Sequence, residues 1–241
     1  MRKKLIAVLG AGAILAVLAS VAYGAVSIVF TANATPAKAG KPTGLKVNFT
    51  VTEPGQPQPP ILNRVVIKLQ KGGKYNSSKF PRCNLATLQA KGPTGCPGKS
   101  KIGTGTGIGR ALPVVEDPVN GKLTLFNGSK VGGKDAVFVY VFPDLGPTFV
   151  VVCKISKKVS GNFDYTLDCS IPPIKTLPSA PDASVVETKT TTQKKIIKKG
   201  KKKYALIVAP KKCSGKWKAE AQFFFATGET ATAPYSGKCK K

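Results

Sequence analysis

The 241-residue sequence predicts an all-β protein: an antiparallel β-sandwich of jelly-roll or Ig-like topology that follows an N-terminal signal segment. Three observations predict this fold class. Glycine and proline number 25 and 19, and they supply the backbone angles that many tight turns need. Short segments of apolar or alternating residues lie between the turn signals, as in strands. No stretch beyond the N-terminal segment shows a sustained helical period, so no helix is expected.

The N-terminal residues have the pattern of a secretory signal. Arg2, Lys3 and Lys4 form a positive start, and residues 5–22 are apolar. Small residues end this stretch and provide a cleavage site. Residues 1–24 are therefore predicted to be a signal peptide.

Apolar residues resume directly after the predicted cleavage site, at residues 26–30. The whole segment 5–30 is also long enough to span a bilayer, so an uncleaved membrane anchor is the alternative. The β-branched composition of 26–30 favours the first strand of a folded domain. Residues 25–241 are then predicted to form a single disulfide-stapled domain.

Turn clusters such as 53–55, 127–129 and 143–147 separate the remaining strands. Residues 136–142 are apolar at every position, which predicts a strand that is covered on both faces. Residues 216–223 alternate between polar and apolar, as a strand with one wet face does. The expected strands are 26–33, 44–52, 63–70, 101–109, 122–127, 136–142, 148–156, 162–169, 184–196, 203–209, 216–225 and 230–236.

The net charge is the unusual feature of the composition. Lysine and arginine number 38 against 11 aspartates and glutamates, which gives a formal net charge of +27. Nearly all of the excess is lysine, a hydrated point charge that favours diffuse attraction to polyanions over sequence-specific recognition. The chain has no histidine, which removes a common zinc ligand and the Ser-His and Cys-His pairs of nucleophilic catalysis. No catalytic residue, metal or cofactor is expected.

Seven lysines fall within ten residues, at what the pattern predicts to be a hairpin tip. Such density attracts polyanions by counterion release, and outside the cell these are anionic wall polymers, acidic polysaccharide, anionic lipid headgroups and, without sequence preference, nucleic acid. The alternative role is to keep the protein soluble and to protect strand edges. Aromatic residues are not interleaved with the lysines, which argues against a dedicated single-strand binder. The candidate polyanion-binding residues are Lys194, Lys195, Lys198, Lys199, Lys201, Lys202 and Lys203.

Residues 102–109 alternate glycine with threonine or isoleucine and look like a phosphate-binding glycine loop. A dinucleotide fingerprint must open a helix within a βαβ unit, and no helix-forming sequence follows Gly109. We therefore interpret this segment as a strand in which another backbone or a bulky side chain packs closely against the glycines.

Two carboxylates are candidates for glycoside chemistry. Asp164 and Asp168 lie four residues apart on one face of an expected strand, within the range of an inverting pair. Sandwich folds also host carbohydrate sites, although fold alone does not decide function. A carbohydrate-binding or carbohydrate-active domain is therefore the alternative function.

Six cysteines follow the signal segment, and an even number in an exported chain predicts disulfides. A three-residue loop at 160–162 would place Cys153 directly opposite Cys169 in a hairpin. Proximity predicts the other two pairs, the second of which brackets a hairpin that turns near 227–229. No Cys-x-x-Cys pair occurs, which argues against a redox or metal site. The predicted pairs are Cys83 with Cys96, Cys153 with Cys169, and Cys213 with Cys239.

Several motifs occur together along most of the chain after the signal segment. The moderately specific part is Gly92-Pro93-Thr94-Gly95-Cys96-Pro97 followed by Ser100-Lys101-Ile102-Gly103-Thr104-Gly105, and looser matches are Pro59-Pro60, 65–69, 80–83, 209–213, Trp217, 227–228 and Cys239. On these residues the chain resembles a group of uncharacterised exported β-sandwich proteins of soil actinobacteria. The resemblance implies export, a β-sandwich and disulfides between neighbouring cysteines, and it implies no activity.

The leading hypothesis is a secreted or cell-envelope protein without enzymatic activity, whose lysine-rich surface binds anionic envelope polymers. Membrane contact is expected only if the N-terminal segment remains as an anchor. A further hypothesis is a structural envelope or adhesion subunit that assembles through its strand edges. The sequence predicts no particular oligomeric state.

Overall fold

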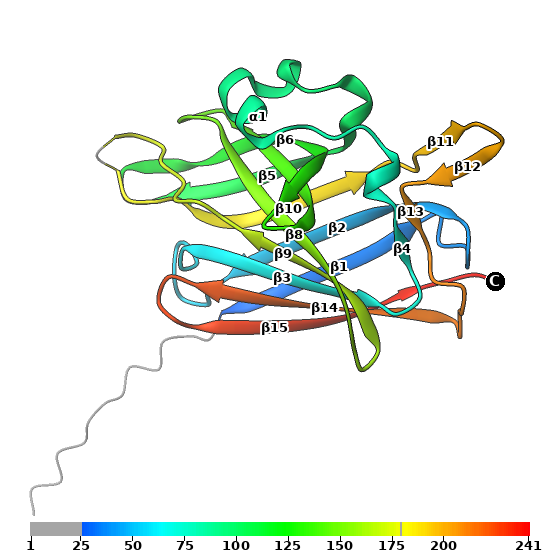
Figure 1. Ribbon diagram of the computed structural model, residues 1–241. Helices are drawn as coiled ribbons and strands as arrows, with labels where there is room; N and C mark the ends of the chain where they lie inside the picture. Colours follow the sequence, from blue (N-terminus) through cyan, green and yellow to red (C-terminus); the bar gives the residue numbers. More distant parts are fainter. Residues whose placement is uncertain (1–25, 179) are drawn as a thin grey trace, which may run out of the picture.

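Antiparallel strands dominate the computed structural model, which describes residues 26–178 and 180–241 (Figure 1). The all-β prediction is confirmed, and each expected strand has a counterpart. The predicted signal peptide, residues 1–24, lies outside the described residues. The strands are β1 (Ser27–Thr35), β2 (Pro42–Thr52), β3 (Leu62–Gln70), β4 (Lys74–Tyr75), β5 (Lys101–Ala111), β6 (Val115–Val131), β7 (Lys134–Pro143), β8 (Phe149–Ser160), β9 (Phe163–Ser170), β10 (Ser184–Thr192), β11 (Ile196–Lys199), β12 (Lys202–Ala205), β13 (Ile207–Val208), β14 (Lys216–Phe225) and β15 (Thr230–Lys238).

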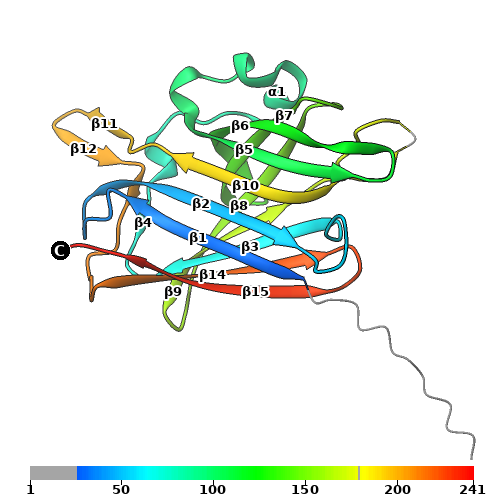
Figure 2. The ribbon, with the colours of Figure 1, turned by 180° about the vertical axis from the view of Figure 1, so that it is seen from behind.

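Thirteen strands of the described chain form one continuous sheet that folds back over itself as a sandwich. The hydrogen-bonded order is β15-β14-β3-β9-β8-β7-β6-β5-β10-β2-β13-β4, with β1 paired to β2. Figures 1 and 2 show β5 and β6 in the layer next to the helix α1 (Leu85–Lys91), and β1, β3, β14 and β15 in the opposite layer. The β8–β9 hairpin connects the layers on one side, and β10 connects them on the other through its pairing with β5 and β2.

Two edge strands of the sheet, β1 and β15, cover each other, and the short strand β4 forms a further end. The Tyr235 hydroxyl donates to Asn33 Oδ1 at 2.9 Å, and the Tyr235 ring meets the edge of Phe30 with centroids 6.2 Å apart. Just beyond the strands, Lys38 and Lys240 form a parallel backbone bridge. An edge that is covered in this way does not offer a free ladder to another chain.

Two apolar clusters fill the space between the layers. The first includes Phe49 and Phe223, whose rings pack edge to face with centroids 5.2 Å apart. The second includes Leu123, Ile155 and the fully buried Leu206. Strand β14 contributes to the first cluster from one face only, so the predicted wet face of residues 216–223 is confirmed.

Strand β7 is covered on both faces over residues 136–141, as its sequence predicts, whereas Phe142 is 55% exposed. Val137 and Val141 pack into the second cluster, while Ala136 and Phe138 are fully buried on the outer side. The outer cover includes Leu88 of α1. The apolar outer face of β7 is therefore explained by a helix that the sequence analysis did not expect.

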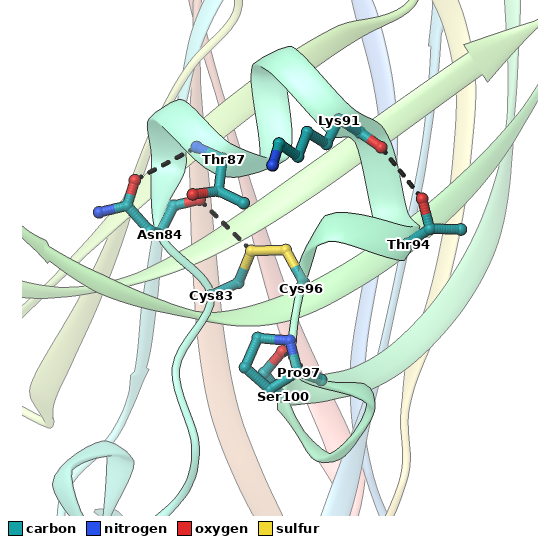
Figure 3. The surroundings of a disulfide bond; sticks show 8 residues. All are labelled: Cys83, Asn84, Thr87, Lys91, Thr94, Cys96, Pro97 and Ser100. Carbon is teal, nitrogen blue, oxygen red and sulfur yellow. Dashed lines mark hydrogen bonds between the residues drawn. A yellow bond between two sulfur atoms is a disulfide. The ribbon is translucent and has the colours of Figure 1, made fainter.

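The expectation of an all-strand chain is thus wrong between β4 and β5. The helix α1 begins after Asn84, whose Oδ1 accepts from the Thr87 N–H at 3.2 Å, and the Cys83–Cys96 disulfide closes the segment (Figure 3). It has seven residues and buries only Leu88. One buried side chain in two turns creates no periodicity, which is why the sequence pattern does not show the helix. Three 3-10 turns flank it, at Ser77–Lys79, Gly92–Gly95 and Gly98–Ser100.

Residues 127–129 are not a turn, although their composition predicts one. They lie within β6, where Gly128 faces the Phe138 ring and a Cβ would approach the ring carbons to 2.7–2.9 Å. The Asn127 side chain is fully buried and donates to the Ser77 and Pro81 carbonyls at 3.2 and 2.9 Å. Glycine and asparagine serve packing here, and the chain turns three residues later.

All three predicted disulfides are present. Cys153 lies directly opposite Cys169 in the β8–β9 ladder, as the register argument requires. The turn itself differs from the expectation, because Ser160 pairs with Phe163 around a two-residue loop and a bulge between Lys157 and Ser160 restores the register. The Cys213–Cys239 bond brackets the β14–β15 hairpin, where the Gly228 N–H donates to the Phe225 carbonyl.

Candidate polyanion-binding surface

The predicted lysine hairpin exists as a separate two-stranded sheet, β11–β12. It projects from one end of the sandwich, the same end at which the C-terminus lies (Figures 1 and 2). Lys199 pairs with Lys202, so two residues form the turn, and the first of them, Gly200, has the positive φ of +57° that such turns favour. The sequence therefore forms a tight hairpin here, between the expected strands 184–196 and 203–209.

The base of the hairpin is fixed to the core. Ile197 lies opposite Tyr204, and both pack against the second apolar cluster. Just beyond the hairpin, the Leu206 N–H donates to the Lys195 carbonyl at 2.9 Å. A rigid base and a projecting tip hold the lysines away from the body of the protein.

Like charges lie directly opposite each other in this hairpin. Lys198 pairs with Lys203 and Lys199 pairs with Lys202, and all four are exposed. Within the described residues, no carboxylate forms an ion pair with any of them. Like charges at opposed positions destabilise a strand pair, so the arrangement works against the stability of the hairpin itself.

Lysines from a distant part of the chain join the base of the hairpin. Lys195 Nζ donates to the Lys99 carbonyl at 3.5 Å, and its pKa is lowered by partial burial and then by repulsion from Lys101. Lys79 Nζ lies 5.5 Å from the centroid of the Tyr204 ring. We call the combined set the lysine surface: Lys79, Lys99, Lys101, Lys194, Lys195, Lys198, Lys199, Lys201, Lys202 and Lys203.

The three lysines at 79, 99 and 101 are not among the candidate residues that the sequence predicts. They lie on or beside the 3-10 turns around α1, about 100 residues before the hairpin in the chain. Each is an isolated lysine among turn residues, and no local pattern marks it. Their position depends on β5 and the hairpin meeting in space, which a one-dimensional pattern does not show.

The two candidate carboxylates have different partners. Asp168 accepts a bidentate pair of hydrogen bonds from Arg64, at 2.7 and 2.8 Å, and this contact lowers the pKa of Asp168. Asp164 is buried, and its Oδ2 accepts from the Gly72 N–H at 2.9 Å. A carboxylate that is held ionised is a poor general acid, so Asp168 does not suit the acid role in an inverting pair.

The glycine segment is a strand, as interpreted. It forms β5, and a Cβ at Gly103 or Gly105 would overlap the carbonyl oxygens of Thr191 and Lys189 on β10. The close approach of another backbone therefore explains these glycines. Lys101 to Ala111 run on as one strand, and the next element is the strand β6.

Other features bear on the compartment in which the protein works. Three disulfides are typical of an oxidising, extracellular-type environment. The described part of the chain contains no helix with the length and apolarity that a membrane crossing requires. The same residues contain no cluster of His, Cys, Asp or Glu that could hold a metal ion.

Comparisons with family models, with curated proteins and with solved structures returned no match to this chain. The function must therefore be inferred from the residues of this chain, and the lysine surface is the candidate site that they define.

Proposed function

We propose that this chain is a secreted or cell-envelope protein without enzymatic activity, whose lysine surface binds anionic envelope polymers by charge. The observation that carries the proposal is the hairpin with two directly opposed lysine pairs and no carboxylate partner within the described chain. A polyanion would relieve the repulsion that the fold leaves in place.

The composition of the surface supports low-specificity attraction. Each cation is a lysine, which binds a phosphate or carboxylate as a point charge, without the planar fork of arginine. The ring of Tyr204 is approached by Lys79, so it does not form a bare platform for stacking bases. These features favour wall polymers and acidic polysaccharide over single-stranded nucleic acid as the partner.

The test is a titration of the purified protein with a polyglycerol-phosphate wall polymer at increasing salt. The variant replaces Lys198, Lys199, Lys202 and Lys203 with glutamine. We expect the slope of log K against log salt to become shallower by about 3, since each neutralised phosphate contributes about 0.7–0.9 to the slope. A matched control with the same net charge replaces four exposed lysines elsewhere, Lys71, Lys122, Lys158 and Lys218, with glutamine.

The control separates a local surface from general charge. The proposal predicts that the control variant keeps the slope and affinity of the wild type. An equal loss in both variants would contradict the assignment to the lysine surface. Binding that does not weaken with salt would contradict the electrostatic mechanism, and equal binding to a neutral glucan at high salt would favour the carbohydrate alternative.

A further inference from the structure

A hollow lies inside the sandwich, between the two apolar clusters. Its volume is about 310 Å³. Val47 and Ile67 line it from the first cluster, and Leu123 and Val137 line it from the second. Protein interiors are usually packed without voids of this size, so the cavity needs an explanation.

The cavity exists because one wall is built from small residues. The strand β5 presents Gly107 and Gly109 to it beside Ile108, and the neighbouring strand β10 presents Thr188, Thr190 and Thr192 beside Val185 and Glu187. A Cβ at Gly107 would meet the Glu187 carbonyl oxygen at 3.6 Å and Leu123 at 4.0 Å, which are ordinary contacts. Gly107 is therefore not required by crowding, unlike Gly103 and Gly105, and a larger side chain there would enter the cavity.

Two of the three threonine hydroxyls on this wall are hydrogen-bonded to β2. Thr190 Oγ1 donates to the Val47 carbonyl at 3.0 Å, and Thr192 Oγ1 donates to the Leu45 carbonyl at 3.3 Å. These bonds to β2 leave the methyl groups of the threonines as lining groups. The wall is thus apolar in spite of its composition, and an apolar cavity does not hold water well.

One end of the cavity is different. Leu145, in the loop after β7, lines the cavity and is also 37% exposed, so the cavity reaches the surface there. Thr176 lines the same end: a Cβ on Gly146 would come within 3.1 Å of the Thr176 Cα. The Thr176 side chain is 4% exposed, and its Oγ1 has no hydrogen-bond partner among the described residues. A buried hydroxyl without a hydrogen-bond partner costs free energy, unless a bound molecule supplies that partner.

We propose that this cavity binds one aliphatic molecule with a single terminal hydroxyl or carboxyl group, with the chain inside and the polar group at Thr176. The volume is roughly twice that of an engineered apolar cavity of about 150 Å³ that holds benzene, which corresponds to about twelve carbon atoms. The inference goes beyond the function proposed above and does not depend on it, because no residue of the lysine surface lines the cavity.

The chain carries its own reporter for this site. Trp217 is the one tryptophan of the sequence, and it lines the cavity. We expect 12-bromododecan-1-ol to quench its fluorescence to saturation with one molecule bound, and dodecan-1-ol to displace it and to raise the melting temperature. The absence of saturable quenching would overturn the proposal.

Variants locate the binding. Gly107→Leu places a side chain in the cavity and should abolish quenching while the melting temperature stays equal or rises. If Gly107→Leu does not fold, Gly121→Val is the second filling variant, since its Cβ would meet Val141 Cγ1 at an ordinary 3.5 Å. The control is Phe142→Ser, which removes a 55% exposed apolar side chain outside the lining and should leave binding unchanged. Normal binding by a folded filling variant would show adsorption to the surface and overturn the proposal.

Thr176 is tested by a pair of ligands. Thr176→Val should lower the affinity for dodecan-1-ol about five- to tenfold, the usual effect of one lost hydrogen bond, and leave the affinity for dodecane unchanged. An equal change for both ligands would overturn the placement of the polar group. The variant with four glutamines in the hairpin should bind dodecan-1-ol as the wild type does, which separates this proposal from the polymer-binding one.

Discussion

The solvent-exposed face around β3 and the β11–β12 hairpin differ in how their charged residues are paired. On the exposed face of β3, two cations have carboxylate partners on neighbouring strands: Arg64 pairs with Asp168, and Lys68 Nζ lies 2.7 Å from Glu220 Oε1. At the end of the β14–β15 ladder, by contrast, Lys216 lies opposite Lys238. In the hairpin, each of four positions has a lysine opposite a lysine. The chain has only 11 acidic residues, and two of them, Asp168 and Glu220, form ion pairs between neighbouring strands of the main sheet. The hairpin is therefore a local concentration of unpaired positive charge on a protein that carries exposed lysines elsewhere as well.

The largest expected difference between the two regions is the effect of a substitution on stability, because the sheet packs on the apolar core and the hairpin tip does not. Phe223 is fully buried under the wet face of β14, with its ring against Phe49. Phe223→Ala should lower the free energy of unfolding by about 3–5 kcal/mol through lost burial and the cavity left behind. Lys201→Ala, at the hairpin tip, should change it by less than about 0.5 kcal/mol. Urea unfolding measures both, and similar losses would show that the hairpin is part of the core.

A charge reversal in the hairpin should move stability and binding in opposite directions. Lys199→Glu places an acid opposite Lys202, so the hairpin should gain a few tenths of a kcal/mol. Affinity for the polyglycerol-phosphate polymer should fall about tenfold at moderate salt, because the charge of the surface changes by two. Thermal unfolding and polymer titration check the two effects.

The matched control for this reversal is Lys122→Glu, an exposed position on β6 with the same change of net charge. It should leave polymer binding close to that of the wild type. A loss of stability in Lys199→Glu would contradict the idea that repulsion between the lysine pairs destabilises the hairpin.

The smallest expected effect is the acid dependence of the wet face. The hydrogen bonds from Arg64 lower the pKa of Asp168 below its unfolded value, so their contribution is complete above about pH 4 and is lost as the pH falls through the folded value. Because the Arg64 side chain is 47% exposed, we expect less than about 1 kcal/mol. The melting temperatures of wild type and Asp168→Asn should differ near neutral pH and converge in acid. A difference that persists at low pH would assign the effect to packing.

The strands and disulfides could be predicted because their signals are local. The alternation of residues 216–223 indicates which side chains of that strand point to the core, and the apolar run 136–142 indicates a strand in the core. The spacing of Cys153 and Cys169 predicts that they lie opposite each other in a hairpin. The predictions that failed concern residues that act through packing. Gly128 reads as a turn residue, but it is small because the Phe138 ring lies against it. Leu88 alone cannot reveal a helix.

The candidate site could likewise be predicted only in part. The seven hairpin lysines are contiguous and visible in the sequence, whereas Lys79, Lys99 and Lys101 join them only through the fold. The cavity was not predicted at all, since it depends on Gly107, the threonines of β10 and Leu123 of the neighbouring strand β6 all lining the same interior space. A glycine that avoids a clash and a glycine that leaves a space look identical in a sequence.

The contact between β1 and β15 also has a consequence for how the chain folds. Asn33 and Tyr235, which hydrogen-bond to each other, are separated by 202 positions. Contacts between such distant segments slow folding, because a long loop must close before the contact repays its entropy. During synthesis, Phe30 gains its aromatic neighbour only when the last strand has emerged. The contact between β1 and β15 therefore forms only after the last strand has been synthesised. Until then, the apolar residues of β1 that β15 covers stay exposed and can promote aggregation.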